Sequence, residues 1–404
     1  MATCVTRTVW RASAAMWKSS STYQRTLLNA HVYPSAPNSI ITLTQKRSLF
    51  VLPFGLDVGL VGFAAYYLTK LKKPEPQNVL SIFGPDPWGK ESQQHPEKVV
   101  RCIAHRGAAL DAPENTMEAL KYCVEHDCNI IELDVRASRD GKLILLHDEG
   151  LERLTGTDIS SVRTIDWDRI KDIDVGSTHP NRKQFKDVRL CLLDDALDYL
   201  LANNVKIIID VKGEDKQVIA GILSAYASRP TLYQHAAVTC FNPFVLYQIR
   251  RNNPDIVGAL SYRPYCFSSQ DYDAEKGPNN PRFGDNLALH GLLRAADVVH
   301  ALLWRWAARW CSVSAVLLHK DIVSASEIHY WRWLGIRCAG WCVNRPLEKL
   351  YWRGVLKAPY LANTLLGEPD VEGKRTDKEY SNDRPGPLVD KILEPERKMS
   401  SGQN

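Results

Sequence analysis

Three short clusters of side chains could do chemistry together in this chain. They are His105-Arg106-Gly107, Glu132-Leu133-Asp134 and His147-Asp148. Imidazoles carry protons near neutral pH, a guanidinium binds an anion through a planar fork of donors, and carboxylates hold a cation. These are the groups needed to cut a phosphodiester.

The acidic cluster lies in an apolar run, 129–135, that predicts a strand. Residues two apart in a strand point to the same side, so Glu132 and Asp134 would converge. Two converging carboxylates repel each other unless a cation lies between them, and oxygen ligands suit Mg²⁺ or Ca²⁺ better than Zn²⁺. A solvated strand face is the alternative, but the apolar neighbours argue for burial, where unpaired carboxylates are costly.

A hairpin would bring the second histidine back to these carboxylates. Asp140-Gly141, between two extended runs, is the strongest short hairpin signal, and a parallel crossover would need a dozen or more residues. We therefore expect an antiparallel return, as an excursion above the main sheet, that delivers His147 to the acidic cluster.

The order of these motifs resembles the glycerophosphodiester phosphodiesterase family, in its membrane-anchored animal type. Between the clusters lies Pro113-Glu114-Asn115-Thr116, which opens a helical pattern. Further matches follow in the same order, at residues 207–212, 239–241 and 340–344. The resemblance therefore covers roughly residues 99–366.

The resemblance implies an α/β fold, a (β/α)₈ TIM barrel of the phosphodiesterase (phospholipase C-like) type. The apolar runs support it independently, because they alternate mostly with helical patterns. The eight expected strands are 99–105, 129–135, 206–212, 236–240, 256–262, 313–318, 336–342 and 359–363. The motif residues fall at the ends of these runs, where barrel enzymes carry their active sites.

By matching position, the resemblance implies that Glu132, Asp134 and Asp210 bind a divalent metal, with Mg²⁺ as the first expectation and Ca²⁺ as the alternative. The family usually has Glu at the third position. Asp210 keeps the charge but is one methylene shorter, which could change the ion preference or bring in a water ligand.

The resemblance also implies roles for the remaining motif residues. Arg106 would bind the phosphate, Lys212 would add a second positive charge, and His105 and His147 would be general acid and base in an order that the sequence leaves open. Trp341 is either barrel packing or a wall for the alcohol group of the substrate.

Two motif positions carry less certain roles. Glu114 and Asn115 stand beside a helix start, so capping competes with substrate contact. The family's last strand usually ends in an Ile-Thr-Asp-like sequence, whereas this chain has Ala362-Asn363-Thr364, which puts any role of a terminal Asp in doubt.

Residues 48–68 form a mostly apolar stretch that predicts a transmembrane helix. At about 1.5 Å per residue it can cross a bilayer of roughly 30 Å. Asp57 opposes insertion by roughly 2.5–3.5 kcal/mol, while the Leu, Val and Phe residues favour it by about 0.3–0.6 kcal/mol each. A buried or re-entrant segment is the alternative, because Pro53 and three glycines weaken the helix.

Charge is concentrated before this stretch. The first 56 residues hold six basic residues and no acid, while the whole chain carries +5. The remainder lacks the basic excess that nucleic-acid binding needs, so no nucleic-acid partner is expected. We expect a basic tail over 1–47, a linker over 69–98 and a disordered tail over 367–404.

The location follows from the anchor. We predict attachment to an endomembrane or the plasma membrane, and a mitochondrial membrane is the alternative, since an acid-free basic amino terminus also resembles a transit peptide.

The segment 285–311 carries a second membrane signal. At helical spacing Leu292, Val299 and Leu303 gather on one face, and Arg294 and Asp297 gather opposite. Such a helix either packs on the barrel or lies in a membrane interface beside the mouth of the site.

The function that this resemblance implies is metal-dependent hydrolysis of glycerophosphodiesters, such as glycerophosphoinositol, to glycerol 3-phosphate and an alcohol. The alternatives are lysophospholipase D action on lysophospholipids or N-acyl glycerophosphoethanolamines and, more weakly, a phospholipase C-like reaction with a cyclic phosphate product. From another class, the chain could be a catalytically silent membrane interaction protein.

Overall fold

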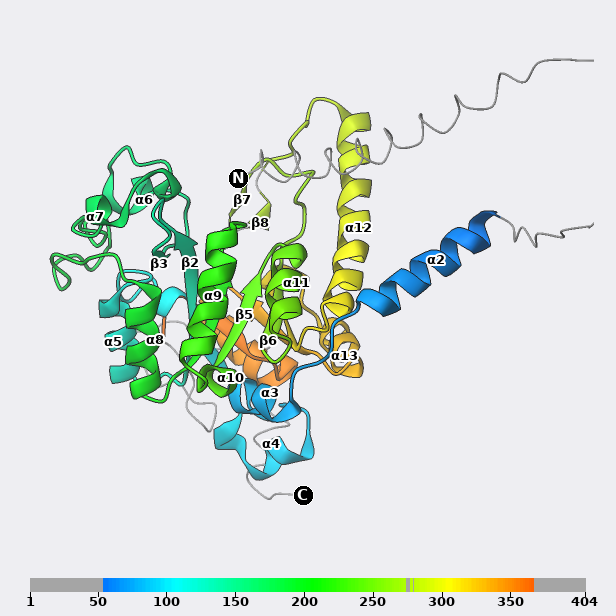
Figure 1. Cartoon of the computed structure of the whole chain (residues 1–404), viewed down its shortest axis with the longest axis horizontal. Helices are drawn as coiled ribbons and strands as arrows, with labels where there is room; N and C mark the ends of the chain where they lie inside the picture. The colour runs from blue at the N-terminus through cyan, green and yellow to red at the C-terminus, as the bar shows by residue number, and fades with distance from the viewer. Residues whose placement is uncertain (1–53, 274–276, 279, 367–404) are drawn as a thin grey trace, which may run out of the picture. The chain divides into compact units, whose positions relative to one another are not determined.

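A closed barrel of eight parallel strands organises the chain, in a computed structural model that describes residues 54–273, 277–278 and 280–366 (Figure 1). Each strand pairs with its neighbours in chain order, and the last pairs with the first. The barrel strands are β1 (Cys102–Ala104), β2 (Ile130–Ala137), β4 (Lys206–Val211), β5 (Ala236–Cys240), β6 (Val257–Tyr262), β9 (Ala315–His319), β10 (Arg337–Trp341) and β11 (Tyr360–Ala362). The predicted TIM barrel is confirmed, and all eight predicted strands correspond to strands of the barrel.

The barrel belongs to a unit that spans Gly59–Asn404. Of the preceding unit, Met1–Val58, the described residues form only the start of helix α2 (Phe54–Thr69). The predicted basic tail, the first part of the predicted transmembrane stretch and the predicted carboxyl-terminal tail lie outside the described residues.

Alternation along the strands explains how the barrel is filled. Along β2, Ile130 belongs to the apolar cluster inside the barrel, whereas Ile131 and Leu133 pack in the larger cluster with the surrounding helices. Glu132 and Asp134 share the side of Ile130, because side chains two apart point the same way. The strand therefore turns its carboxylates inward, towards its carboxyl end.

Helices connect the strands and cover the barrel. They differ in length, and the longest has 24 residues. The helices that follow β1 are α5 (Met117–Glu125), α6 (Glu152–Thr155), α7 (Trp167–Ile170), α8 (Leu193–Ala202), α9 (Lys216–Ser228), α10 (Leu232–His235), α11 (Pro243–Asn252), α12 (Leu287–Trp310), α13 (Ala325–Trp333) and α14 (Pro346–Tyr351).

The predicted hairpin is present. β3 (Leu143–Leu145) runs antiparallel beside the end of β2, and Gly141 in the turn has a φ of 82°, a conformation that glycine adopts without strain. The chain then makes an excursion over residues 146–190 with a small apolar core of its own, which includes Leu151, Ile170 and Val188. The hairpin is thus an addition to the barrel wall, as predicted, and not a further pair of parallel strands.

The expected linker over 69–98 is instead largely folded. It contains α3 (Pro76–Phe83) and α4 (Lys90–Gln94), and Ile82 and Phe83 of α3 are buried in the cluster inside the barrel. This stretch closes the amino-terminal end of the barrel. A short apolar helix within a polar stretch is a weak signal, because its burial depends on the strands that it covers.

Gly340 offers a test of barrel packing. A Cβ at this position would overlap the buried indole of Trp352, which lies in a π-helical turn after α14. We expect Gly340→Ala to lower the free energy of unfolding by about 1–3 kcal/mol through overpacking. Urea unfolding in detergent measures it. Gly291→Ala is the matched control, because an added Cβ there meets nothing within 4 Å; equal midpoints for the two variants would contradict the packing argument.

Candidate active site

Three buried carboxylates meet at the carboxyl end of two neighbouring strands. Glu132 and Asp134 come from β2, and Asp210 comes from β4, directly beside Asp134 in the parallel register. All three are at most 5% exposed, and each offers an oxygen within 4.8 Å of the others. The three acids that the sequence predicts as metal ligands are therefore brought together.

The burial of these three acids shifts their pKa values. Burial and the neighbouring carboxylates raise the pKa of Glu132 well above its usual value, and burial also raises that of Asp210. Burial acts on Asp134 in the same direction, but Lys212, His147 and Arg106 outweigh it and hold its pKa below the usual range. The neighbouring positive charges therefore do not offset the burial and mutual repulsion of all three acids.

Lys212 supplies part of that charge. Its Nζ donates to Asp210 Oδ2 at 2.6 Å and lies 3.0 Å from Asp134 Oδ1. Burial lowers the pKa of Lys212, but the carboxylates more than offset this and raise it, so the ammonium stays charged. The predicted second positive charge is thus next to the acidic trio.

Both backbone polar groups of Arg106 form hydrogen bonds. Its N–H donates to Glu132 Oε2, its carbonyl accepts from the N–H of Asn115, and its φ of 55° is unusual for a residue with a side chain. The side chain reaches Glu114 Oε1 at 3.2 Å and Asp134 Oδ2 at 3.5 Å. The guanidinium therefore lies at the edge of the trio.

The residues of the Pro113-Glu114-Asn115-Thr116 motif have different hydrogen-bond partners. Thr116 caps α5 by accepting from the Ala119 N–H, whereas Asn115 donates to Asp134 Oδ2 and accepts from the Asp134 N–H. Glu114 pairs with Arg106 and Arg153. Neither Glu114 nor Asn115 caps the helix; both orient charged groups of the site.

His105 follows β1 and is buried beside the trio. Its Nδ1 lies 2.6 Å from Asn363 Oδ1, and its Nε2 lies 3.8 Å from Glu132 Oε2. An amide oxygen accepts, so Nδ1 carries the proton and Nε2 is the unprotonated nitrogen. Burial and the nearby Arg106 lower the pKa of His105 to about 3, so this imidazole is neutral at physiological pH.

His147 has a different environment. Its Nδ1 lies 2.7 Å from Asp148 Oδ1, and Asp148 Oδ2 accepts from Arg153 Nε at 2.6 Å. Arg153 also donates through both terminal nitrogens to the two oxygens of Glu114. Despite burial, bonds to His147 and Arg153 hold the pKa of Asp148 below its usual range. An ionised carboxylate thus faces one nitrogen of His147.

Aromatic side chains border the site. Trp341 ends β10, with its ring 4.5 Å from that of His319 and 6.2 Å from that of Phe241. Phe241 is 42% exposed, and its ring lies 5.5 Å from Lys212 Nζ. Trp341 therefore belongs to an apolar wall next to the charged groups, in addition to packing at the end of the barrel.

The donors fit a hard divalent cation. All three candidate ligands offer carboxylate oxygens, and Asp210 Oδ1 is buried without a hydrogen bond from any described residue. Lys212 compensates only part of the negative charge of three acids. A cation at the trio would satisfy both the free oxygen and the remaining charge.

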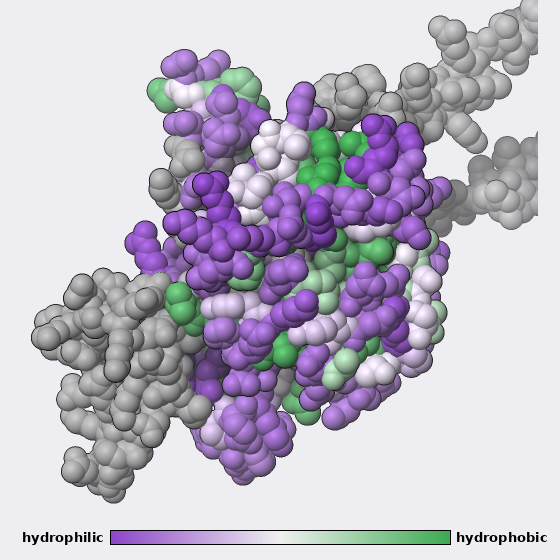
Figure 2. All heavy atoms as spheres, turned by 90° about the vertical axis from the view of Figure 1, so that its left-hand side faces the viewer, coloured by the Kyte–Doolittle hydropathy of each residue, from purple (hydrophilic) through white to green (hydrophobic). Residues whose placement is uncertain are grey.

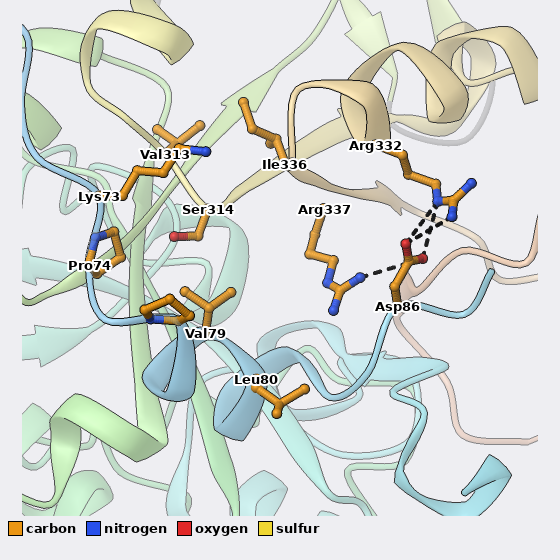
Figure 3. A pocket seen from close by; sticks show the side chains of 12 residues that line it. Lys73, Pro74, Val79, Leu80, Asp86, Val313, Ser314, Arg332, Ile336 and Arg337 are labelled. Carbon is orange, nitrogen blue, oxygen red and sulfur yellow. Dashed lines mark hydrogen bonds and ion pairs between the residues drawn. The ribbon is translucent and has the colours of Figure 1, made fainter. Parts of the chain in front are cut away.

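A cavity of about 460 Å³ lies elsewhere, at the amino-terminal ends of β9 and β10 (Figure 3). Its charged side chains mostly pair with one another, since Asp86 binds both Arg332 and Arg337. The acidic trio and the two histidines do not line it, so it is separate from the candidate active site.

Comparison with known proteins agrees with this geometry. The sequence profile of the Glycerophosphoryl diester phosphodiesterase family matches residues 105–360, more than half of the chain. The chain belongs to this family. The predicted membership, and with it the predicted enzyme class, a glycerophosphodiester phosphodiesterase, are confirmed.

Curated relatives and solved structures of glycerophosphodiester phosphodiesterases align over the barrel. The chain is 30% identical to glycerophosphodiester phosphodiesterase 1 of Homo sapiens over 277 residues, which are 67% of this chain and 80% of the relative. The Mus musculus protein of the same name gives the same identity and coverage. A phosphodiesterase from Oleispira antarctica, solved in complex with the product sn-glycerol-3-phosphate, superposes with a TM-score of 0.51 at 18% identity, over 65% of this chain and 92% of that one.

Sequence reasoning missed three residues of the site. Asn363 was noted only as a departure from the family pattern, yet it fixes the His105 ring. Arg153, six residues after His147, carries no signal of its own, because its role depends on segments that meet only in the fold. Phe241, directly after the fourth predicted strand, was noted only as part of the 239–241 match and was given no role.

Glu132→Gln tests whether the trio is a cation site without relying on activity. Because the pKa of Glu132 is raised, holding this acid in the fold without a cation costs free energy at neutral pH. In chelator we expect the variant to be more stable than the parent by about 0.5–2 kcal/mol. Mg²⁺ or Ca²⁺ should stabilise the parent and have little effect on the variant.

Thermal unfolding in detergent, with chelator or with each ion, measures this. Asp195→Asn, an exposed carboxylate on α8, is the control and should behave as the parent. An equal ion-dependent gain in parent and Glu132→Gln would show that the trio holds no cation.

Proposed function

We propose that this chain hydrolyses glycerophosphodiesters, such as glycerophosphoinositol, to glycerol 3-phosphate and an alcohol, with Glu132, Asp134 and Asp210 holding a divalent cation. The observation that carries the proposal is the meeting of three buried carboxylates at the carboxyl end of the barrel, in a chain of this family. The product bound to the Oleispira antarctica phosphodiesterase is the same glycerol 3-phosphate.

Mg²⁺ is the proposed ion, with Ca²⁺ as the alternative. A small, tightly packed set of carboxylate oxygens favours the smaller ion, although the shorter Asp210 leaves room for a water ligand. When bound, the cation would neutralise the phosphate and stabilise the negative charge that builds on its oxygens.

Arg106 and Lys212 would bind the phosphate from either side of the trio. Arg106 contacts Asp134 Oδ2, whereas Lys212 contacts Asp134 Oδ1 and Asp210. The two positively charged side chains therefore contact different oxygens of Asp134. A phosphate between them would accept the paired donors of the guanidinium and a point charge from the ammonium.

The environments of the two histidines favour different roles. His105 is neutral and keeps Nε2 free to accept a proton, so we assign it as the base that takes the proton of the attacking water. If the glycerol hydroxyl attacks first, His105 would take its proton, and water must then open the cyclic phosphate to give glycerol 3-phosphate. Asp148 holds the ring of His147 through its Nδ1, and with His105 assigned as the base we assign His147 as the acid that protonates the leaving alcohol oxygen. Trp341 would border the alcohol group.

Turnover of a substrate panel tests the proposal directly. Glycerophosphodiesters and lysolipids are incubated with the parent or Glu132→Gln, in Mg²⁺, Ca²⁺ or chelator, and the products are identified. We expect glycerol 3-phosphate from the parent with an ion, and a loss of at least about 100-fold in chelator or in the variant. Asp195→Asn is again the control.

Three results would reject the proposed hydrolase. Equal turnover by the parent and by Glu132→Gln in chelator would show that the reaction needs no cation at this site. No turnover of any substrate by the parent would favour the catalytically silent interaction protein, and a cyclic phosphate product would favour the phospholipase C-like reaction.

Arg153 is a proposed positioning residue, because it joins Asp148, next to the proposed acid, to Glu114, next to Arg106. We expect Arg153→Met to lower kcat by about 10–100-fold with a smaller change in KM, as expected for misplaced groups. Arg153→Lys should recover only part of the lost kcat, because one ammonium cannot replace the planar fork of donors of a guanidinium.

The control for Arg153 comes from the hairpin turn between β2 and β3, before the excursion. Arg139 also pairs with an acid, Asp166, but lies away from the histidines, so Arg139→Met should keep the parent kcat. If Arg153→Met loses activity only in proportion to its unfolded fraction, measured by urea unfolding, the residue is merely structural.

Lysophospholipase D action on lysophospholipids or N-acyl glycerophosphoethanolamines is the second candidate. It is favoured by the exposed Phe241 beside Trp341, which offers an apolar surface next to the phosphate-binding groups. The same panel separates the two, because this activity requires an acyl chain on the substrate.

We further propose that residues 48–68 anchor the chain in an endomembrane or the plasma membrane, with a mitochondrial membrane as the alternative. The apolar character of α2 supports the anchor, since Leu60, Val61 and Leu68 are exposed on it. Alkaline extraction and fractionation of cells that express the full chain would separate these locations from a soluble enzyme.

A further inference from the structure

Helix α12 is amphipathic in the reverse sense of an ordinary surface helix. Along its length the side chains turned away from the protein are large and apolar. They are Leu287, Leu292, Val298, Val299, Leu302, Leu303 and Trp306, each 42–82% exposed. A helix that covers a barrel in water normally points such residues inward and its charges outward.

Most of the charged and polar groups of α12 contact the protein instead, although Arg294 and Arg309 are also exposed. Asp297 is buried and accepts from the N–H groups of Phe267 and Ser268, while Arg305 pairs with Glu327. Arg294 lies over the ring of Tyr265 at 4.3 Å. The polar groups that would make a water-facing surface are therefore used in tertiary contacts.

This orientation bears on the two alternatives for the segment. A barrel helix of the ordinary kind would bury Leu292, Val299 and Leu303, whereas the structure exposes all three. The segment is also long and apolar enough to cross a membrane, but its inner face, with Trp304 and Ala308 buried, is packed against the fold. A helix fixed in this way can touch a bilayer only with its outer face.

The apolar surface continues onto α2. The ring of Tyr66 lies 5.4 Å from that of Trp306, which stacks on Trp310 at 5.6 Å. Trp310 Nε1 donates to Thr69 Oγ1, which ties the end of α2 to the end of α12. Exposed residues of α2 that extend this surface are Leu60, Val61, Phe63, Tyr67 and Leu68.

The chemistry of this border matches a lipid interface. Tyr66, Trp306 and Trp310 gather where the two helices meet, and Lys70 lies over the ring of Tyr66 at 5.6 Å. Aromatic rings and basic residues are enriched at the level of the lipid headgroups. The exposed face of α12 includes Arg309 but no acid, which suits anionic lipids.

Another side of the molecule looks different. Figure 2 shows the side that carries α5, α7 and the excursion, and it is mainly hydrophilic with small scattered apolar areas. Exposed apolar patches larger than a few hundred Å² are rare on soluble monomers and mark contact surfaces. The exposed apolar residues of α12 and α2 meet at Tyr66 and Trp306 and form one continuous apolar patch.

The patch is also connected to the mouth of the site. Asp297 of α12 holds residues 267–268 of the loop that follows β6. Later in that loop, the ring of Tyr272 lies 4.9 Å from that of His319, at the carboxyl end of β9. His319 in turn contacts Trp341 of the apolar wall. The loop after β6 therefore joins α12 to the aromatic side of the site.

We propose that the outer face of α12, together with residues 59–69 of α2, is a bilayer-contact surface, on which α12 lies in the plane of the lipid interface without crossing it. A second copy of the chain is the less favoured occupant, because the surface is continuous with α2, which forms part of the predicted membrane anchor. The contact stands independently of catalysis; only its consequence, that acyl-bearing substrates reach the site from the membrane, rests on the proposed function.

Photo-crosslinking in vesicles tests the contact on the full chain. The protein is reconstituted in phosphatidylcholine and phosphatidylserine vesicles that contain a phosphatidylcholine with a diazirine in its acyl chain, and the labelled peptides are identified by mass spectrometry. We expect adducts on residues 287–306 in addition to the anchor. Adducts confined to residues 48–69 would overturn the proposal and favour a second copy of the chain as the occupant of α12.

A pair of variants makes the result specific. Val299→Asn with Leu303→Gln should lower the adduct yield on α12 several-fold and slow turnover of lysolipid in vesicles. Turnover of soluble glycerophosphoinositol should stay at the parent level. The control is Trp333→Gln with Leu347→Gln, two exposed apolar residues on α13 and α14, which should change neither. Equal adduct yields for both pairs would contradict the proposal.

Labelling from one side distinguishes an interfacial from a transmembrane helix. Gly291→Cys and Arg309→Cys, near the two ends of α12, are each treated with a membrane-impermeant maleimide on sealed vesicles, with the parent as background. An interfacial helix exposes both ends on the same side, whereas labelling on opposite sides overturns the proposal. Glu132→Gln should give the parent's adducts, so a failed activity assay would leave the membrane result intact.

Discussion

Three carboxylates within 4.8 Å of one another, all buried, form the constraint on which the site depends. Burial and mutual repulsion oppose their ionisation, so the surrounding fold must supply positive charge and donors. Arg106 and Lys212 supply two charges, and Asn115 donates to Asp134. These groups come from two different connections, the one after β1 and the one after β4, which the barrel must therefore hold in register. The unusual backbone at Arg106 fits this requirement, because its N–H is fixed by Glu132.

The barrel provides that register with few residues. Parallel pairing sets Asp134 beside Asp210, and the alternation along β2 turns Glu132 to the same side. The antiparallel β3 then returns the chain, so that His147 follows the carboxylates at the same end of the barrel. The excursion after β3 has its own small core, which holds Arg153 as a link between Asp148 and Glu114. A segment added outside the barrel thus orients a group at its centre.

The parts of this arrangement that follow from local pattern could be predicted from the sequence. The strands, the hairpin at Asp140-Gly141 and the convergence of Glu132 with Asp134 depend on periodicity and turn chemistry, which are local. Asn363 and Arg153 could not be assigned, because each acts on a residue far away in the chain or across an irregular loop. The folding of residues 69–98 was missed for the same reason, since α3 is stabilised by the barrel end that it closes.

Helix α12 shows why a correct periodicity does not determine orientation. The pattern separates an apolar face from a charged face, but either face can be turned to the fold. Here Asp297 and Arg305 have specific partners in the loop after β6 and in α13, so the charged face is turned inward. Because these bonds satisfy buried polar groups, rotating the helix to hide Val299 and Leu303 would leave Asp297 without its donors. The apolar face therefore stays outside, and only an apolar environment such as a bilayer removes it from water.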